Sequence, residues 1–247
     1  MNERQERIYK IISKLKNATI EHLSNEVFAS PATIRRDLTK MENEGLIVRV
    51  WGGAVLTGAN TLDPPKFVRS NANLEAKKLI ARKALSLIPE NSSLFLPSGT
   101  TVAEFCKLLP SLKDVTVITT SLDALNSLGQ TSSFKIYSLG GELYERYDFV
   151  GSTTLNAIDK FSADYLLFSC SGITENGFTS NDINRLDVIE RMQKNAKKTI
   201  LLCDTSKVNK KCMYNGFDFS KIDFVIMEKA PQNSALIQKL KDKLIIL

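Results

Sequence analysis

From about residue 74 onward, short apolar runs alternate with segments of helical periodicity, and this alternation constrains the fold more than any other feature. Strands buried on both faces have near-continuous apolar sequences, and helices between such strands let neighbours run parallel. Six runs predict strands, at residues 93–96, 115–119, 134–139, 165–168, 199–203 and 223–227. The sequence therefore predicts an α/β domain over residues 74–247, Rossmann-like, with a mostly parallel sheet covered by helices.

The first 57 residues have a different pattern, in which apolar side chains recur every three or four residues over three short segments. This spacing predicts three helices. Their inner faces are Ile8, Ile11, Ile12 and Leu15, then Ile20, Leu23 and Val27, then Ile34, Leu38 and Met41. Thr19 and Ser30 are placed to cap the second and third helices, and Pro31 suits the first position of the third.

A β-rich run over residues 46–51 follows the third helix, which is expected to end at Gly45. Gly52-Gly53 then turns the chain into a second apolar run at residues 54–56. Three helices followed by a hairpin predict a winged helix-turn-helix domain over residues 1–57.

Residues 58–73 show no sustained periodicity and include the rigid dipeptide Pro64-Pro65. We expect this segment to be a linker between the two domains.

Composition excludes several classes of protein. The chain is 43% hydrophobic and 24% charged, close to globular averages, so it is not disordered as a whole. Its longest apolar runs reach strand length only, whereas a membrane span needs roughly 20 apolar residues. The start, Met1 to Arg7, carries charges of both signs and no apolar signal core, so we expect a cytoplasmic protein.

Cysteine and histidine, the residues that most often bind metals, give little support for a metal site or a cofactor. The four cysteines have no paired spacing, and His22 is the only histidine. They are Cys106, Cys170, Cys203 and Cys212. We expect reduced thiols, no metal site and no cofactor.

The third predicted helix presents small polar groups and two adjacent arginines, Arg35 and Arg36, opposite its apolar face. Such a helix start suits the DNA major groove, where a guanidinium can bind guanine or phosphate. A solvated charged face is the usual reading of an isolated arginine pair, but the capped turn and the wing favour DNA. The candidate DNA-binding residues are Thr19, Ser30, Pro31, Ala32, Thr33, Arg35, Arg36, Lys40, Arg49 and Trp51.

At these residues the chain resembles DeoR-type bacterial transcriptional regulators. The matching motifs are Thr33-Ile34-Arg35-Arg36-Asp37-Leu38, Glu42, Glu44-Gly45 and Arg49-Val50-Trp51-Gly52-Gly53-Ala54. Trp51 departs from the histidine that this family usually has there. The resemblance implies double-stranded operator DNA as the partner.

A loop of small residues, 98–101, lies between a predicted strand and a predicted helix. Amides, hydroxyls and a helix start at such a loop can bind an anion, although Ser and Thr cap many helices for structural reasons. The family's second domain is a sugar-phosphate sensor similar to ribose-phosphate isomerases, and the resemblance extends over 98–101, 119–121, 140–141, 151, 172–177 and 204–207. It implies a phosphorylated sugar effector, held by Ser98, Gly99, Thr100, Thr101, Thr119, Thr120, Ser121, Gly140, Gly141 and Lys207.

Three departures from the family affect this site. Pro97 replaces an acidic residue, Thr120 replaces asparagine, and Ile189 stands where lysine is common. Because a carboxylate is a strong acceptor for hydroxyls, we expect the sugar half of the site to be depleted and selectivity among sugar phosphates to be shallow.

The leading hypothesis is a repressor of a sugar or sugar-alcohol operon, a homodimer or homotetramer, whose operator affinity changes when a sugar phosphate binds. One alternative is a sugar-phosphate isomerase fused to a DNA-binding module, for which no catalytic residues are evident. The other is a constitutive DNA binder with a vestigial sensor domain.

Overall fold

The computed structural model describes all residues except 16, 45, 57–65, 130–133, 146, 233, 241 and 247. The chain divides into two compact units, Met1–Val68 and Arg69–Leu247. Half of the expected linker, residues 58–65, and the expected helix end at Gly45 lie outside the described residues. The linker's described part was not expected to be helical, yet it contains helix α4 (Lys66–Asn71), which crosses the boundary between the units.

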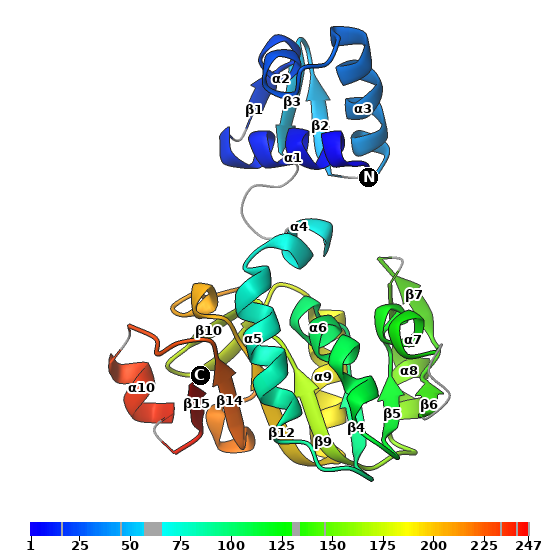
Figure 1. Ribbon diagram of the computed structural model, residues 1–247, viewed down its shortest axis with the longest axis vertical. Helices are drawn as coiled ribbons and strands as arrows, with labels where there is room; N and C mark the ends of the chain where they lie inside the picture. Colours follow the sequence, from blue (N-terminus) through cyan, green and yellow to red (C-terminus); the bar gives the residue numbers. More distant parts are fainter. Residues whose placement is uncertain are drawn as a thin grey trace. The chain divides into compact units, whose positions relative to one another are not determined.

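The first unit is a winged helix-turn-helix, as predicted (Figure 1). Its elements are α1 (Glu3–Leu15), β1 (Asn17–Thr19), α2 (Ile20–Val27), α3 (Pro31–Asn43), β2 (Ile47–Val50) and β3 (Gly53–Leu56). Strands β2 and β3 form the wing, and β1, which the sequence did not predict, pairs with β3 in an antiparallel sheet of order β1-β3-β2. Strand β1 has only three residues, too few for alternation to reveal it.

The core of the first unit contains most of the apolar residues predicted for the three helices. Leu15, expected on the inner face of the first helix, is instead 48% exposed as the last residue of α1. Ile8, Ile12, Leu23, Ile34 and Met41 are completely buried. One charged group lies among them. Asp37 of α3 is 3% exposed and accepts hydrogen bonds from Arg4 Nε at 2.6 Å and Gln5 Nε2 at 2.9 Å. The start of α1 is thus tied to the middle of α3.

The second unit is built on a seven-stranded parallel sheet of order β15-β14-β12-β9-β4-β5-β6. Its strands are β4 (Ser93–Leu96), β5 (Thr116–Thr119), β6 (Lys135–Ser138), β9 (Ala163–Phe168), β12 (Ala196–Leu202), β14 (Phe224–Met227) and β15 (Leu244–Ile246). The first six of these confirm the six predicted strands. The short strand β15 was not predicted.

Helices cover both faces of this sheet (Figure 1). They are α5 (Leu74–Leu85), α6 (Thr100–Leu108), α7 (Leu122–Leu128), α8 (Ser152–Ile158), α9 (Ile183–Lys194) and α10 (Ser234–Leu240). Side chains of α5, α6 and α7 share one core cluster with alternate residues of the strands, and those of α8, α9 and α10 share the other. The mostly parallel, helix-covered architecture is therefore as expected.

Short hairpins and turns lie between the major elements. They are β7 (Glu142–Tyr144) with β8 (Asp148–Val150), β10 (Gly172–Thr174) with β11 (Gly177–Ser180) and β13 (Tyr214–Asn215), and 3-10 turns at Leu109–Ser111, Thr205–Lys207 and Phe219–Lys221. These strands have two to four residues each, so the sequence pattern did not predict them.

The direction in which the chain adds successive strands to the sheet reverses beside β4. Strands β5 and β6 continue outward on one side of β4, whereas β9 pairs with its other side and β12, β14 and β15 continue from there. In an open parallel sheet, such a reversal leaves a crevice at the carboxyl ends of the two central strands, where ligands bind. The loops after β4 and β9 are therefore the first place to look for a site.

Replacing Asp37 by Ala is expected to lower the free energy of unfolding of the first unit by about 1–3 kcal/mol, because the buried Gln5 amide loses its acceptor. Chemical denaturation followed by circular dichroism measures the change. Glu26→Ala, which removes an exposed carboxylate from α2, is the control and should change stability by less than about 0.5 kcal/mol. Equal losses in the two variants would show that the buried network contributes nothing.

Candidate functional sites

The start of α3 is capped and exposed. Ser30 Oγ accepts from the Thr33 amide at 3.2 Å and lies 2.9 Å from Thr33 Oγ1, and Pro31 occupies the first turn. Arg35, Arg36 and Lys40 are exposed, as are Ser30, Pro31 and Ala32. The structure thus places seven of the candidate residues on or beside one helix surface, opposite buried Ile34 and Leu38.

The wing is fastened to α3 through Arg49. The Arg49 amide donates to Glu42 Oε1 at 2.9 Å, its Nε lies 3.3 Å from Glu42 Oε2, and its guanidinium also donates to Thr39. Arg49 is therefore already ion-paired, and its contacts hold the wing against α3. Trp51, at the tip of the hairpin, is fully exposed.

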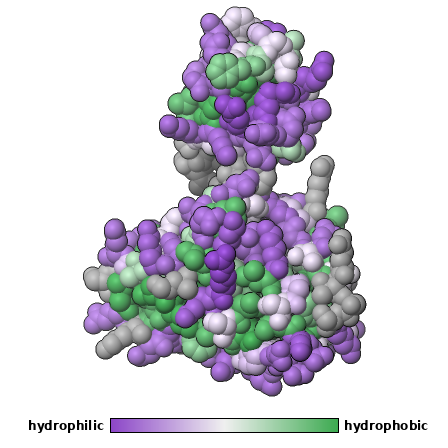
Figure 2. All heavy atoms as spheres, viewed as in Figure 1, coloured by the Kyte–Doolittle hydropathy of each residue, from purple (hydrophilic) through white to green (hydrophobic). Residues whose placement is uncertain are grey.

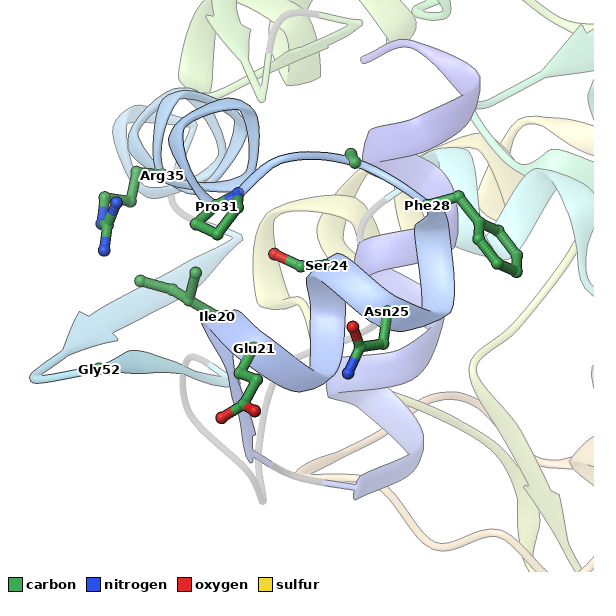
Figure 3. A pocket seen from close by; sticks show the side chains of 9 residues that line it. Ile20, Glu21, Ser24, Asn25, Phe28, Pro31, Arg35 and Gly52 are labelled. Carbon is green, nitrogen blue, oxygen red and sulfur yellow. The ribbon is translucent and has the colours of Figure 1, made fainter.

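A hollow of about 700 Å³ opens between α2, the start of α3 and the turn of the wing (Figure 3). It is lined by Ile20, Glu21, Ser24, Asn25, Phe28, Ala29, Pro31, Arg35 and Gly52. Figure 3 shows Pro31, Arg35 and Ile20 toward one end and Phe28 at the other. Thr19 directly precedes Ile20 in the sequence, and its hydroxyl caps α2 by accepting a hydrogen bond from the His22 amide.

Phe28 ends α2 with a φ of 52°, in the left-handed region that bulky residues rarely adopt, and its side chain is 91% exposed. Both features cost stability without improving the core.

In the second unit, the loops after β4 and β9 meet at the reversal of the sheet. A Cβ atom at Gly99 would lie 2.4 Å from Ser169 Oγ, so a larger residue there would require the Ser169 hydroxyl to move. Gly99 begins α6 without a side-chain cap, which leaves first-turn amides such as that of Thr101 for another acceptor. Thr101 Oγ1 is buried and has no hydrogen-bond partner within the described part of the chain.

Two lysines add positive charge at this edge. Lys77 of α5 is 3% exposed, and Lys207 follows β12 with its Nζ 3.8 Å from Asp204 Oδ2. Burial, together with the nearby charge of Lys207, lowers the pKa of Lys77 to about 8 against the attraction of Asp204. Asn73 Nδ2 donates to Asp204 Oδ1 at 3.1 Å. Lys207 was a candidate from the sequence, whereas Lys77 was missed because it is one of several lysines along an amphipathic helix.

A carboxylate lies at the same loop, although the sequence led us to expect its loss at Pro97. Asp148 of β8 is 2% exposed and accepts from Ser98 Oγ, from Thr120 Oγ1 at 3.1 Å and from Arg185 Nε at 3.2 Å. Burial raises the pKa of Asp148, while the hydrogen bond from Ser98 and the charge of Arg185 oppose that rise. Asp148 and Arg185 come from a short hairpin and from α9, and no sequence motif marks either of them.

Other candidate residues are engaged within the fold. Thr119 Oγ1 donates to the Leu96 carbonyl at 2.5 Å, and Ser121 Oγ caps α7. The space beside Gly141 is filled, since a Cβ there would lie 1.9 Å from Thr154 Oγ1, and the Gly140 carbonyl accepts from the same hydroxyl at 3.0 Å. Ile189, where the family often has lysine, lies in the apolar core. Of the candidate residues, Ser98 and Thr120 meet at Asp148, while the loop from Ser98 to Thr101 and the turn with Lys207 follow the carboxyl ends of β4 and β12.

Two family models match the chain. A DeoR-like helix-turn-helix domain matches residues 4–59, and a DeoR C-terminal sensor domain matches residues 72–229. The chain belongs to the DeoR family. As a member of the DeoR family, it is a DNA-binding transcriptional regulator.

Curated relatives in the DeoR family match almost end to end. An L-fucose operon activator of Haemophilus influenzae is 33% identical over 94% of this chain and 94% of its own length. A glycerol-3-phosphate regulon repressor of Escherichia coli is 30% identical over 97% of this chain and 95% of its own. Among solved structures, a D-ribose-5-phosphate isomerase in complex with phospho-erythronic acid is 22% identical with a TM-score of 0.42, over 55% of this chain and 54% of that one.

Among the described residues, no helix is long and apolar enough to cross a bilayer, and no cluster of three or more His, Cys, Asp or Glu side chains could hold a metal ion. Cys106, Cys203 and Cys212 are buried, and Cys170 Sγ lies 4.0 Å from Cys203 Sγ. Hydrophilic side chains cover much of the visible face of each unit, with smaller hydrophobic patches between them (Figure 2).

Arg35→Ala and Arg36→Ala are each expected to weaken specific DNA binding by about 1–3 kcal/mol if the guanidinium reaches a base edge. If the contact is to phosphate alone, binding should weaken on all sequences alike and the salt dependence should flatten. Mobility-shift titrations at two salt concentrations measure both effects. Arg82→Ala, an exposed arginine of α5 outside this unit, is the control. Parental binding by both helix variants would contradict the assignment of α3 as the recognition helix.

Proposed function

We propose that this regulator represses a sugar or sugar-alcohol utilisation operon and that a phosphorylated sugar, bound at the carboxyl edge of the seven-stranded sheet, changes its affinity for the operator. The observation that carries the proposal is the cationic crevice at the start of α6, where buried Lys77 and the unpartnered hydroxyl of Thr101 lie at one edge of the sheet with Lys207. The names of the relatives support the choice of ligand class, since one is an L-fucose operon activator and another is a glycerol-3-phosphate regulon repressor.

The crevice supplies what a phosphate needs. The first amides of α6 point outward along the helix axis, at the positive end of the helix dipole. Such a helix start binds phosphate readily. The Thr101 hydroxyl can donate to a phosphate oxygen, and Lys207 can neutralise the charge of the phosphate. Lys77 is costly to bury as a cation, and a dianionic ligand would offset that cost.

The sugar half is sparser. A carboxylate has about four lone-pair sites, and Asp148 already uses three of them for Ser98, Thr120 and Arg185. One site therefore remains for a ligand hydroxyl, together with the acceptor positions of the Ser98 and Thr120 hydroxyls. This arithmetic supports the expectation of shallow selectivity among sugars.

On the DNA side, we propose that α3 enters the major groove and that the wing lies along the flanking backbone. The candidate contacts remain Thr19, Ser30 to Thr33, Arg35, Arg36, Lys40, Arg49 and Trp51. One recognition helix reads only a short half-site, so we propose a homodimer or homotetramer acting in the cytoplasm.

An isomerase is the alternative from another class, and we propose that the chain is not one. Moving a proton between adjacent carbons needs a base with a free lone pair near the substrate. Asp148 is held by a guanidinium and two hydroxyls, which compete for that role. The close relatives are regulators. Turnover of a sugar phosphate by the purified chain would support the alternative.

Lys207→Ala is expected to weaken effector binding by about 1.5–3 kcal/mol, because it removes a charged hydrogen-bond donor to phosphate. Calorimetry against glycerol 3-phosphate, glucose 6-phosphate, fructose 1-phosphate, the unphosphorylated parents and inorganic phosphate measures it. Lys211→Ala, an exposed neighbour, is the control and should bind like the parent. Tight binding of an unphosphorylated sugar, or affinity untouched by the Lys207 change, would overturn the phosphate-anchored site.

Effector affinity should also depend on pH through Lys77. With a pKa of about 8 in the free protein, Lys77 is charged at pH 7 and mostly neutral at pH 9, so phosphate binding is expected to weaken about tenfold across that interval. A phosphate monoester, with its second pKa near 6, stays dianionic throughout. Calorimetry at both pH values measures the change. Lys77→Gln should bind weakly at pH 7 with a flat profile, and an equally steep profile in that variant would exclude Lys77 as the cause.

A further inference from the structure

Arg69, the first residue of the second unit, is bonded to the candidate effector site in two separate ways. Its main-chain carbonyl accepts a hydrogen bond from the Lys77 ammonium. Its Nη2 donates to Tyr147 Oη at 2.9 Å. Both partners lie far from it in the sequence or on another helix, so the contacts are not a by-product of local geometry.

The first contact leads to the phosphate half of the crevice. Lys77 is buried, and the charges that influence it are those of Lys207, Asp204, Arg69 and Glu104. Its ammonium is occupied by a carbonyl, a neutral acceptor. Hydrogen bonds between two charged groups are roughly twice as strong as neutral ones, so a phosphate at the start of α6 would compete for this ammonium.

The second contact leads to the sugar half. Asp148 accepts from Arg185 Nε at 3.2 Å, and Arg185 Nη2 donates to Tyr147 Oη at 2.8 Å and to Glu145 Oε2 at 2.5 Å. The guanidinium of Arg185 also lies over the Tyr147 ring, 5.1 Å from its centroid. A ligand hydroxyl on Asp148 therefore acts on the same arginine that holds Tyr147.

The Tyr147 hydroxyl has no spare capacity. It donates to Glu145 and accepts from Arg69 and Arg185, which uses its single hydrogen and both lone pairs. Burial raises the pKa of Tyr147 to about 12, so it keeps this proton at neutral pH. When Arg185 moves, Tyr147 has no unused hydrogen-bonding position with which to compensate. The movement therefore also displaces Arg69, which is bonded to the same hydroxyl.

Arg69 is part of α4, which runs from Lys66 to Asn71 and includes Val68, the last residue of the first unit. A helix of six residues moves as one piece, so a displacement of Arg69 displaces the segment that leads to the DNA-binding unit.

We propose that Arg69 and Tyr147 are positioning residues that transmit effector occupancy from Lys77 and Asp148 to helix α4. This inference rests on the proposed function, because it requires a phosphorylated ligand in the crevice. The residues need not touch the ligand. Their role is to make the position of α4 depend on what Lys77 and Arg185 bind.

The test uses Tyr147→Phe in the full chain, which removes only the bridging hydroxyl, with Arg69→Lys as a second variant. Tyr137→Phe removes a half-buried tyrosine hydroxyl elsewhere and is the matched control. The probe is whichever of glycerol 3-phosphate, glucose 6-phosphate or fructose 1-phosphate binds the parent most tightly by calorimetry. Its effect on operator affinity is measured by mobility shift, and hydrogen exchange is followed over residues 66–71.

In the parent and in Tyr137→Phe, the probe is expected to change operator affinity at least tenfold and to alter exchange over residues 66–71. In Tyr147→Phe and Arg69→Lys, probe affinity should stay within about threefold of the parent, while the change in operator affinity falls below twofold and exchange no longer responds. A full operator response in both variants would overturn the inference while leaving the proposed function intact. Failure of the parent to bind any of the three probes would overturn both.

Discussion

All strands of the main sheet run parallel, and this constraint organises the second unit. Parallel neighbours cannot be joined by tight turns, so every connection crosses a face of the sheet, and the carboxyl ends of the strands share one edge. Because the winding reverses between β4 and β9, the edge is open at that point. Residues that are as distant in the chain as Lys77, Ser98, Asp148 and Lys207 meet there for that reason.

Much of the fold could be predicted because its information is local. Near-continuous apolar runs identified six strands, and the caps at Thr19 and Ser30 identified two helix starts. The short hairpins and α4 escaped prediction because a few residues carry no measurable period. Phe28 escaped for another reason: a left-handed φ is usually marked by glycine or asparagine, and phenylalanine gives no such signal.

The candidate site was predictable only in its loops. Ser98 to Thr101 and Lys207 follow strands directly, where polar residues stand out against apolar neighbours. Lys77, Asp148 and Arg185 sit within elements, and their importance arises from burial and from hydrogen-bond partners up to 50 residues away, as between Asp148 and Ser98. The expected loss of an acceptor at Pro97 illustrates the limit. A gap at one position in the sequence was matched in space by a carboxylate from another element.

The close approach at Gly99 has a consequence for how such a chain can diverge. A Cβ at position 99 would lie 2.4 Å from Ser169 Oγ, and the two residues belong to loops after different strands. A larger residue at position 99 therefore requires the Ser169 hydroxyl to rotate away or a smaller residue at position 169. Substitutions in the two loops are thus coupled, although about a quarter of the chain separates them.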